Sequence, residues 1–332
     1  MIPCNNIAIF TAPQTISIEK KPMPTIQPDY VCIKYLYCGI CGGDYSTYLG
    51  RRTKYPISLG HEFVGEVIAC GKNVHKFHCG QIVISDFNYR CGECAFCKEN
   101  RSHLCIQNDI GLFSNRGFAN YAVVHANYLT AISPPKYLPR ACLMEPLSCV
   151  IHACESIHIE SEMRILLCGG GSLGMLFCFY LTRILGDISI DIYESVETRT
   201  LLLESRFPIA QYHDDATNKY DLIIDCTNTK SGLSFSLSHT PVGGNICVLS
   251  HLYGLDTSFV YEQICKKELD CTFPLRNGER KNLKVAAEYI NEFWDNGDDV
   301  LLKTYKSVSA AFRTKASSSA CKQIINCQTL LP

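Results

Sequence analysis

The sequence lacks any marked excess of charge, and this absence narrows the possible classes of function. Charged residues make up 19% of the 332 positions, and the formal net charge is −1. Proteins that bind nucleic acid or anionic membranes through their overall electrostatics carry a clear positive excess. The composition therefore predicts no nucleic-acid partner and no membrane partner.

Long hydrophobic runs are also absent. No stretch is long enough to span a membrane without polar interruption, and residues 1–21 lack the apolar core of a secretory signal peptide. Internal repeats and low-complexity segments are lacking as well. We therefore expect a cytoplasmic protein, and 47% hydrophobic residues over this length are enough for two domains with cores of their own.

Cysteine, by contrast, is abundant, with 21 residues in a chain too long for a small disulfide-stapled scaffold. Cys91, Cys94, Cys97 and Cys105 are spaced C-x2-C-x2-C-x7-C among polar residues. This pattern predicts a closed tetrahedral zinc site. Such a site is structural, because four protein thiolates leave no position for a substrate.

A second group of metal-binding residue types lies between predicted β-strands of the first 90 residues. Cys38 and Cys41 stand close to Asp44, and His61 is followed by Glu62. Cysteine, histidine and carboxylates are ligands that zinc accepts. The alternatives to metal binding differ in strength. Cys38 is best explained as a buried neighbour, and Glu62, taken alone, is also compatible with a surface acid.

The middle of the chain contains a glycine-rich turn between a strand and a helix. Residues 165–168 are an uncharged run typical of a buried strand, and a largely apolar run follows over 173–185. Gly169, Gly171 and Gly174 form G-x-G-x-x-G between them. This order predicts a dinucleotide-binding turn, in which a pyrophosphate lies at the start of the helix.

An acidic residue stands where such a turn requires one. Residues 188–192 predict a second strand, and Glu194 follows it, where a carboxylate accepts hydrogen bonds from the adenosine ribose. A carboxylate there repels a 2′-phosphate, so NAD is favoured over NADP, although Arg199 is close enough in sequence to weaken this argument. The predicted cofactor-binding residues are Gly169, Gly171, Ser172, Leu173, Gly174, Glu194 and Arg199.

The rest of the chain predicts an α/β protein. Short strands separated by turns fill the first 90 residues, and residues 117–124 predict another. The strands at 220–225 and 244–249 continue a doubly wound parallel sheet. A helix is predicted over 283–294, with Asn282 as its N-cap.

These motifs together resemble one family. The series C-G-I-C-G-G-D (38–44), G-H-E (60–62), the four cysteines, E-P-L (145–147) and G-x-G-x-x-G (169–174) is similar to that of the zinc-dependent medium-chain alcohol and polyol dehydrogenases. The order and separations match along nearly the whole chain. Residues 145–154 and 273–277 look most like the sorbitol dehydrogenase branch.

The resemblance implies a GroES-like, β-rich catalytic domain that is split in the sequence. It would comprise residues 1–150 and 277–332, with a structural zinc lobe at about 88–108, and a Rossmann domain over 151–276 that binds NAD. The family also implies a homodimer or homotetramer.

The resemblance further implies a catalytic zinc, so that each chain would hold two zinc ions. Its ligands would be Cys41, His61 and Glu145, with Glu62 beside it as an alternate ligand or a partner of the bound water. Asp44 would orient the His61 ring. Three protein ligands and one open position are what a catalytic zinc needs.

Similarity to the sorbitol branch assigns Arg276 and Asn277 to the substrate side. A phosphorylated substrate would also need a cation, for which Arg276, Arg51 and Arg52 are the candidates. A solvated arginine is the commoner explanation for such residues.

One position departs from the family pattern. Many members have Ser or Thr two residues after the ligand cysteine, where the hydroxyl begins the proton relay, but this chain has Gly43. Ser46 is the first replacement to consider, and Tyr45, Thr47 or a water molecule are the others.

The predicted function is NAD-linked oxidation of a secondary alcohol in a polyol, cyclitol or sugar. Oxidation of an amino alcohol, as in threonine dehydrogenases, and reduction of a sugar phosphate are the enzymatic alternatives. A retained fold with weakened catalysis and a binding role is the non-enzymatic one, and Gly43 is its main support.

Overall fold

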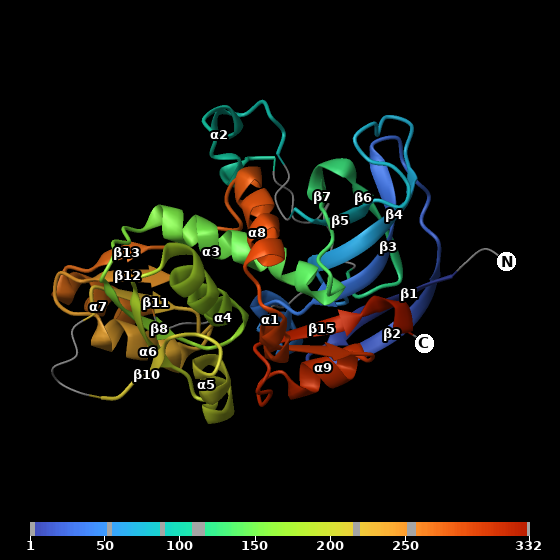
Figure 1. Cartoon of the computed structure of the whole chain (residues 1–332). Coiled ribbons are helices and arrows are strands. Elements are labelled where there is room, and N and C mark those ends of the chain that lie inside the picture. Colours follow the sequence, from blue (N-terminus) through green and yellow to red (C-terminus); the bar gives the residue numbers. More distant parts are fainter. Residues whose placement is uncertain are drawn as a thin grey trace. The chain divides into compact units, whose positions relative to one another are not determined.

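The structure is a computed structural model that describes residues 4–51, 55–86, 90–107, 117–214, 220–250 and 257–330. The chain forms two compact units (Figure 1). The first comprises Met1–Ser148, Arg276–Ala316 and Lys322–Pro332, and the second comprises Cys149–Leu275 and Ser317–Cys321. The short stretch 317–321 thus groups with the second unit although both of its neighbours belong to the first.

The first unit is built mainly of antiparallel strands. Strands β1 (Cys4–Ala12) and β2 (Thr15–Pro22) form a hairpin. Among the described residues a larger sheet has the order β14-β15-β3-β4-β5-β7, and β6 pairs with β3. Its strands are β3 (Tyr30–Gly39), β4 (Glu62–Cys70), β5 (Ile82–Ser85), β6 (Tyr121–His125), β7 (Leu129–Ala131), β14 (Leu302–Tyr305) and β15 (Lys322–Asn326).

Short helices connect these strands. The α-helices that begin in the first unit are α1 (Gly42–Tyr48), α2 (Ala95–Lys98), α3 (Met144–Ser156), α8 (Arg280–Glu292) and α9 (Val308–Thr314). Single 3₁₀ segments are η1 (Ser102–Leu104), η2 (Ala126–Tyr128), η3 (Leu138–Leu143), η5 (Asn296–Leu301) and η6 (Cys327–Thr329). Within the described part of the chain, no helix is both long enough and apolar enough to cross a membrane.

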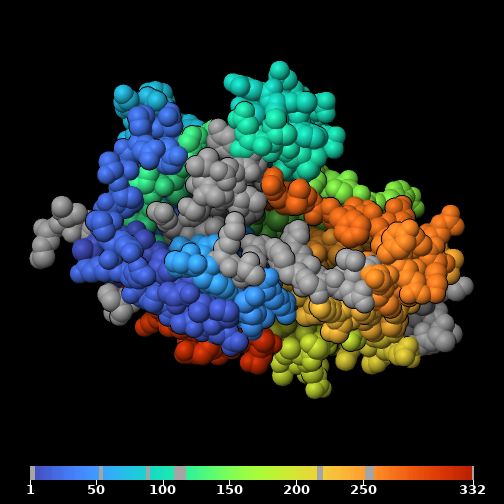
Figure 2. All heavy atoms as spheres, turned by 180° about the vertical axis from the view of Figure 1, so that it is seen from behind, coloured from blue at the N-terminus to red at the C-terminus, as the bar shows by residue number. Residues whose placement is uncertain are grey.

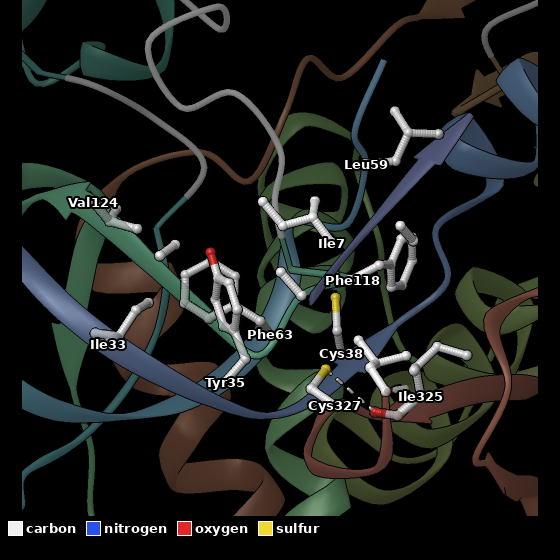
Figure 3. Packing of buried hydrophobic residues seen from close by; sticks show 14 of the residues in the cluster. Ile7, Ile33, Tyr35, Cys38, Leu59, Phe63, Phe118, Val124, Ile325 and Cys327 are labelled. Carbon is white, nitrogen blue, oxygen red and sulfur yellow. Dashed lines mark hydrogen bonds between the residues drawn. The ribbon is translucent and has the colours of Figure 1, made fainter. Parts of the chain in front are cut away.

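Aliphatic and aromatic side chains form the core of the first unit, together with two cysteines (Figure 3). The rings of Tyr35 and Phe63 meet edge to face with centroids 4.7 Å apart, and Phe118 is fully buried. Cys38 and Cys327 are fully buried beside them. These two thiols therefore act as small apolar side chains in a close-packed interior.

The second unit contains a parallel sheet, as the sequence predicts. Its order over the described residues is β10-β9-β8-β11-β12-β13. The strands are β8 (Arg164–Cys168), β9 (Ser189–Tyr193), β10 (Ala210–Gln211), β11 (Leu222–Asp225), β12 (Asn245–Val248) and β13 (Asp270–Thr272). The helices between them are α4 (Ser172–Phe179), η4 (Tyr180–Leu185), α5 (Glu197–Glu204), α6 (Lys230–His239) and α7 (Thr257–Lys267).

The strand order creates a switch point in the middle of this sheet. The chain runs from β8 outward through β9 to β10, then returns to the other side of β8 with β11 and continues to β13. Residues Ile165–Cys168 are completely buried, which explains the uncharged run in the sequence. Ligands of doubly wound sheets bind outside the carboxyl ends of the strands at such a point, and the glycine turn follows β8 there.

Three local predictions are corrected by the structure. The helix predicted over 173–185 is α-helical only to Phe179 and then becomes the π-helical segment η4. The strand predicted over 117–124 begins at Tyr121, because Ala119 only bridges to Ile7 before the chain joins the sheet. Asn282 is not an N-cap: α8 begins at Arg280, and Asn282 is buried in its first turn.

Candidate active site and metal centres

The four thiols predicted to bind a structural zinc converge in the cysteine lobe (residues 90–107). Their sulfur atoms all lie within 4.8 Å of one another. The Sγ–Sγ distances are 3.6 Å for Cys91–Cys105 and 3.9 Å for both Cys91–Cys97 and Cys94–Cys105. Zinc–sulfur bonds of about 2.3 Å arranged tetrahedrally place sulfurs about 3.8 Å apart. The cluster therefore fits a zinc ion in size and in donor type.

The backbone of the lobe prepares these sulfurs for a cation. The N–H groups of Glu93 and Cys94 point at the Cys91 sulfur, each at 3.4 Å. Backbone N–H groups of Cys97 and Ile106 lower the pKa of Cys94 to about 6, whereas burial raises the pKa of Cys97 to about 12. Cys94 is thus a thiolate near neutral pH, and a bound metal would remove the remaining protons.

A second group of metal-ligating atoms lies in the first unit, where β3 ends and β4 begins. Donor atoms of Cys41, His61 and Glu62 are within 4.8 Å of one another. Cys41 is the N-cap residue of α1, and its sulfur accepts the Gly43 N–H at 3.4 Å. The start of a short helix therefore fixes the position of the thiol beside the histidine.

Asp44 holds two members of this group. Its Oδ2 accepts the Cys41 N–H at 3.2 Å, which completes the capping box of α1, and its Oδ1 lies 3.7 Å from Nδ1 of His61. Burial raises the pKa of Asp44, and the attraction of His61 opposes this rise. Burial acts to lower the pKa of His61, but Cys41 and Asp44 outweigh it and raise that pKa well above its usual value. The geometry fits an acid that orients a ligand histidine.

A buried lysine, not foreseen from the sequence, accompanies Glu62. The Lys322 ammonium forms an ion pair with Oε2 of Glu62, and both side chains are buried. A Cβ on Gly39 would stand 2.6 Å from Lys322 Cε and 2.8 Å from that carboxylate oxygen, so Gly39 leaves room for the pair. Burial alone would lower the pKa of Lys322, but Glu62 raises it, so the lysine stays charged. The sequence signal is weak: Lys322 begins β15 (Lys322–Asn326), in which Ile324 and Ile325 are the apolar residues.

Glu145 lies in the first turn of α3 and is nearly fully buried. It is not part of the group whose donor atoms lie within 4.8 Å. Burial raises its pKa to about 7; the repulsion of Glu62 adds to this rise, and the attraction of His61 opposes it. Glu145 therefore shares the electrostatic environment of the Cys41–His61–Glu62 group, and its assignment as a metal ligand remains a prediction.

The residues considered for a proton relay lie on α1. Thr47 donates its hydroxyl to the Gly43 carbonyl at 3.1 Å, and Tyr45 stacks on Tyr48 with centroids 5.9 Å apart. Ser46 is buried, and at about 100° per residue it lies about 200° around the helix from Asp44. Since Asp44 faces His61, a proton would need a water molecule to reach Ser46.

The predicted substrate residues have other partners. Arg276 donates from Nη1 to the carbonyl of His103 in the cysteine lobe at 2.7 Å. Asn277 is fully buried, Arg51 is exposed, and Arg52 lies outside the described residues. The geometry thus directs Arg276 toward the lobe, and its role toward substrate stays a prediction.

The glycine turn in the second unit has the shape of a dinucleotide site. Gly169 has φ of 98°, and a Cβ on Gly174 would stand 1.9 Å from the Gly169 carbonyl oxygen. A Cβ on Gly171 would meet no atom within 4 Å. The fold itself therefore requires glycine at Gly169 and Gly174, whereas Gly171 leaves open space in which a pyrophosphate would fit.

Glu194 and Arg199 are tied into this turn. The Glu194 carboxylate accepts the Gly170 N–H at 2.7 Å, the Val196 N–H at 2.9 Å and Nη1 of Arg199 at 3.0 Å. Arg199 also donates to the Ser318 carbonyl at 2.7 Å. The guanidinium balances the negative charge of Glu194, so the predicted repulsion of a 2′-phosphate is weaker than the sequence indicates.

The start of α4 is the remaining part of the predicted cofactor site. Ser172 opens the helix, and its hydroxyl donates to the carbonyl of Cys321 at 3.1 Å. Leu173 follows and is half-buried. Gly171, the N-cap, offers no side chain to the first N–H groups of the helix. An anion could therefore approach these groups directly.

The sequence is similar to those of known dehydrogenases. Residues 27–134 match the Alcohol dehydrogenase GroES-like domain family. The chain is 36% identical over 171 residues to the D-arabitol-phosphate dehydrogenase of Enterococcus avium, which covers 50% of this chain and 47% of that enzyme. It is 25% identical over 309 residues to a sorbitol dehydrogenase of Halalkalibacterium halodurans, which covers 84% of this chain and 90% of that enzyme.

Solved structures agree in fold. The acetophenone reductase of Geotrichum candidum, in complex with NAD, has a TM-score of 0.82 and covers 99% of this chain and 100% of that chain at 18% identity. An identity this low speaks for the fold alone. Together with the matched domain, it confirms the predicted combination of a GroES-like, β-rich part and a Rossmann-type parallel sheet.

Proposed function

Because the chain belongs to the family of zinc-dependent medium-chain alcohol and polyol dehydrogenases, we propose that it interconverts a secondary alcohol of a polyol, cyclitol or sugar and the corresponding ketone, with NAD as the redox partner. The observation that supports this most strongly is the contrast between two metal sites. Four thiols converge at one site, whereas Cys41, His61 and Glu62 come together at another. With Glu145 as the proposed third protein ligand beside Cys41 and His61, the second site would keep one position open for substrate.

The proposed catalytic residues have distinct tasks. Cys41, His61 and Glu145 would hold the zinc ion, and Glu62 would stay beside it on its ion pair with Lys322. Asp44 keeps the His61 ring turned toward the site. A bound zinc would polarise the alcohol oxygen as a Lewis acid, and NAD would accept the hydride.

The cofactor proposal depends on the second unit. Gly169, Gly171 and Gly174 would accommodate the pyrophosphate at the start of α4, and Glu194 would reach the ribose. NAD remains the favoured cofactor because a Glu194 carboxylate beside the ribose would repel a 2′-phosphate. Since Arg199 balances its charge, we propose a preference for NAD and not an exclusion of NADP.

We further propose a homodimer located in the cytoplasm. Strand β13 ends the sheet of the second unit in the described part of the chain, and Phe273 and Leu275 are exposed just beyond it. An open strand edge with exposed apolar side chains readily pairs with a second copy. Size-exclusion chromatography with light scattering tests this part.

One assay tests the proposed activity. Purified protein is supplied with NAD or NADP and a panel of polyols, cyclitols, their phosphates and L-threonine, and the reduced cofactor is followed by absorbance. We expect turnover with one or more unphosphorylated polyols and NAD. Turnover with threonine alone would establish the amino-alcohol alternative, and no turnover with any compound would favour a binding role.

A further inference from the structure

The segment Arg276–Arg280, here called the returning segment, brings the chain back from the second unit to the first. Its backbone is unusual, because Arg276 has φ of 64° and Gly278 has φ of 63°. Glycine adopts this left-handed conformation freely, but arginine does not. A residue such as Arg276 keeps it only where surrounding contacts hold it.

Those contacts come from the cysteine lobe. Nη1 of Arg276 donates to the His103 carbonyl at 2.7 Å, and Nη2 of Arg90 donates to the Gly278 carbonyl at 3.2 Å. Both left-handed residues of the returning segment are therefore bonded to the lobe. In Figure 2 the lobe projects from the surface.

Glu279 connects the returning segment to two residues of the lobe, Ser102 and His103. Its Oε2 accepts the Ser102 hydroxyl at 2.6 Å, and its Oε1 accepts the His103 N–H and faces His103 Nδ1, both at 3.3 Å. Burial acts to raise the pKa of Glu279, but these hydrogen bonds lower it below its usual value. The carboxylate is therefore ionised at neutral pH, and its side chain is only partly exposed to water.

The position of Glu279 makes this attachment distinctive. It is the N-cap residue of α8, yet its side chain makes no cap hydrogen bond. An N-cap side chain normally accepts the N–H of the second or third helical residue. Here the lobe takes the acceptor that the helix would otherwise use, so the contact is maintained against a local alternative.

Asp86, a buried acid, connects both the cysteine lobe and the returning segment to the sheet of the first unit. Oδ2 of Asp86, at the end of β5, accepts Arg90 Nη1 at 2.6 Å and Arg280 Nε at 2.9 Å. Arg90 begins the lobe and Arg280 ends the returning segment. Asp86 is fully buried, so these charge-assisted bonds are shielded from water.

The metal-binding cysteines reach this network through one short helix. The lobe residues that contact Glu279 belong to η1 (Ser102–Leu104), and the Cys105 N–H bonds back to the Ser102 carbonyl at 3.0 Å. A zinc ion that holds Cys105 therefore also fixes Ser102 and His103. Metal binding and the order of the returning segment are linked through these three residues.

We propose that the cysteine lobe acts as a clamp on the returning segment, with Glu279 as the positioning residue. The zinc of the lobe would then do more than stabilise its own loop: it would hold the backbone of Arg276 and Asn277, which the proposed function assigns to the substrate side. The proposal rests on the proposed function only for that last consequence. The clamp itself rests on the contacts between the lobe and the returning segment.

Hydrogen–deuterium exchange of the zinc-loaded protein tests the clamp. We expect Glu279→Ala to speed exchange of amides in 276–282 by about tenfold or more, and Glu279→Gln, which keeps an acceptor, to have a smaller effect. Glu288→Gln, on the exposed face of α8, is the matched control and should leave exchange unchanged. Unchanged exchange in Glu279→Ala, or faster exchange spread evenly over the first unit, would overturn the proposal.

A reciprocal measurement separates positioning from general stability. If metal in the lobe orders the returning segment, loosening that segment must weaken the hold on the metal. The zinc affinity of the lobe, measured by competition with a colorimetric chelator in a Cys41→Ser background that retains only the lobe metal, should be about tenfold weaker in Glu279→Ala and unchanged in Glu288→Gln. Equal affinities would refute the clamp without bearing on the proposed function. Conversely, a protein without activity that showed both effects would refute only the proposed function.

Discussion

The four thiols of the cysteine lobe come from residues 91–105, whereas the residues proposed to form the catalytic cluster (Cys41, His61, Glu62 and Glu145) come from segments far apart in the chain. The lobe can therefore bring its four thiols together within one short segment. The catalytic cluster exists only when β4, α1 and α3 are in place. We therefore expect the metal of the cysteine lobe to support the local structure of the lobe, whereas the catalytic cluster depends on the folded first unit.

The electrostatic settings differ as well. In the lobe, backbone N–H groups favour the thiolate of Cys94, and the site is half open to water. In the catalytic cluster the acids are buried, and charged neighbours compensate them: His61 for Asp44 and Lys322 for Glu62. The cysteine lobe thus relies on backbone groups close in sequence, whereas the residues around Cys41 rely on charge pairs between residues that are distant in the sequence.

Removing a ligand from the catalytic cluster should have the largest effect on activity. We expect Cys41→Ser to lower kcat/KM by at least about a thousandfold, because Lewis-acid assistance contributes several kcal/mol to the reaction. The fold should persist, since the capping role of Cys41 can pass to serine. Steady-state kinetics and circular dichroism measure both, with the exposed Cys265→Ser as control. Near-normal activity would show that the catalytic metal is placed elsewhere.

Breaking the buried ion pair should show how far the catalytic cluster depends on distant residues. We expect Lys322→Met to lower the free energy of unfolding by about 3–5 kcal/mol, because it leaves the Glu62 carboxylate buried without a counter-charge. Denaturant unfolding measures the change. The double variant Lys322→Met/Glu62→Gln should recover most of it. A small loss in the single variant would mean that water or the metal compensates Glu62.

Only the catalytic cluster would need a route for the proton that the alcohol loses. If Ser46 relays the proton through a water molecule, Ser46→Ala should lower turnover about a hundredfold, with zinc content and NAD binding unchanged. Gly43→Ser should then be neutral or mildly activating, because it restores a hydroxyl near Cys41. Normal turnover of Ser46→Ala, together with loss in Glu145→Gln at full zinc occupancy, would replace Ser46 by a water held at the carboxylate.

The catalytic cluster should also lose metal affinity as the pH falls. Zinc binds only the deprotonated ligands, and the raised pKa values of Glu145, about 7, and His61 mean that the metal-free protein keeps these protons near neutrality. Affinity should therefore rise at least about tenfold per pH unit from pH 5 to 7. Glu145→Gln should remove one proton from this dependence, measured by competition with a chelator. An unchanged slope would exclude Glu145 as a ligand.

The local site was the easier one to predict from the sequence. The spacing of Cys91 to Cys105 specifies the cluster almost completely, because neighbouring ligands need only a short loop. The buried strand at 165–168 and the glycine turn after it were predicted for a similar reason: burial, turn and helix start leave a pattern over a few residues.

What the sequence could not provide were contacts between distant residues. Lys322 meets Glu62 only because β15 pairs with β3, and no local pattern marks that pairing. Arg276 has a left-handed backbone conformation and donates to the carbonyl of His103, 173 residues away in the sequence, and no local pattern marks this contact. Asn282 has the composition of an N-cap, yet the returning segment starts α8 earlier, at Arg280.

The central claim is that the chain has two metal sites of different kinds, and metal analysis of protein purified without chelator tests it most directly. We predict two zinc ions per chain in the wild type. Cys41→Ser should retain one zinc and a normal melting temperature, whereas Cys94→Ser should lose the other together with stability and yield. A single zinc in the wild type, or a loss of stability in Cys41→Ser as great as in Cys94→Ser, would contradict the division into a structural and a catalytic site.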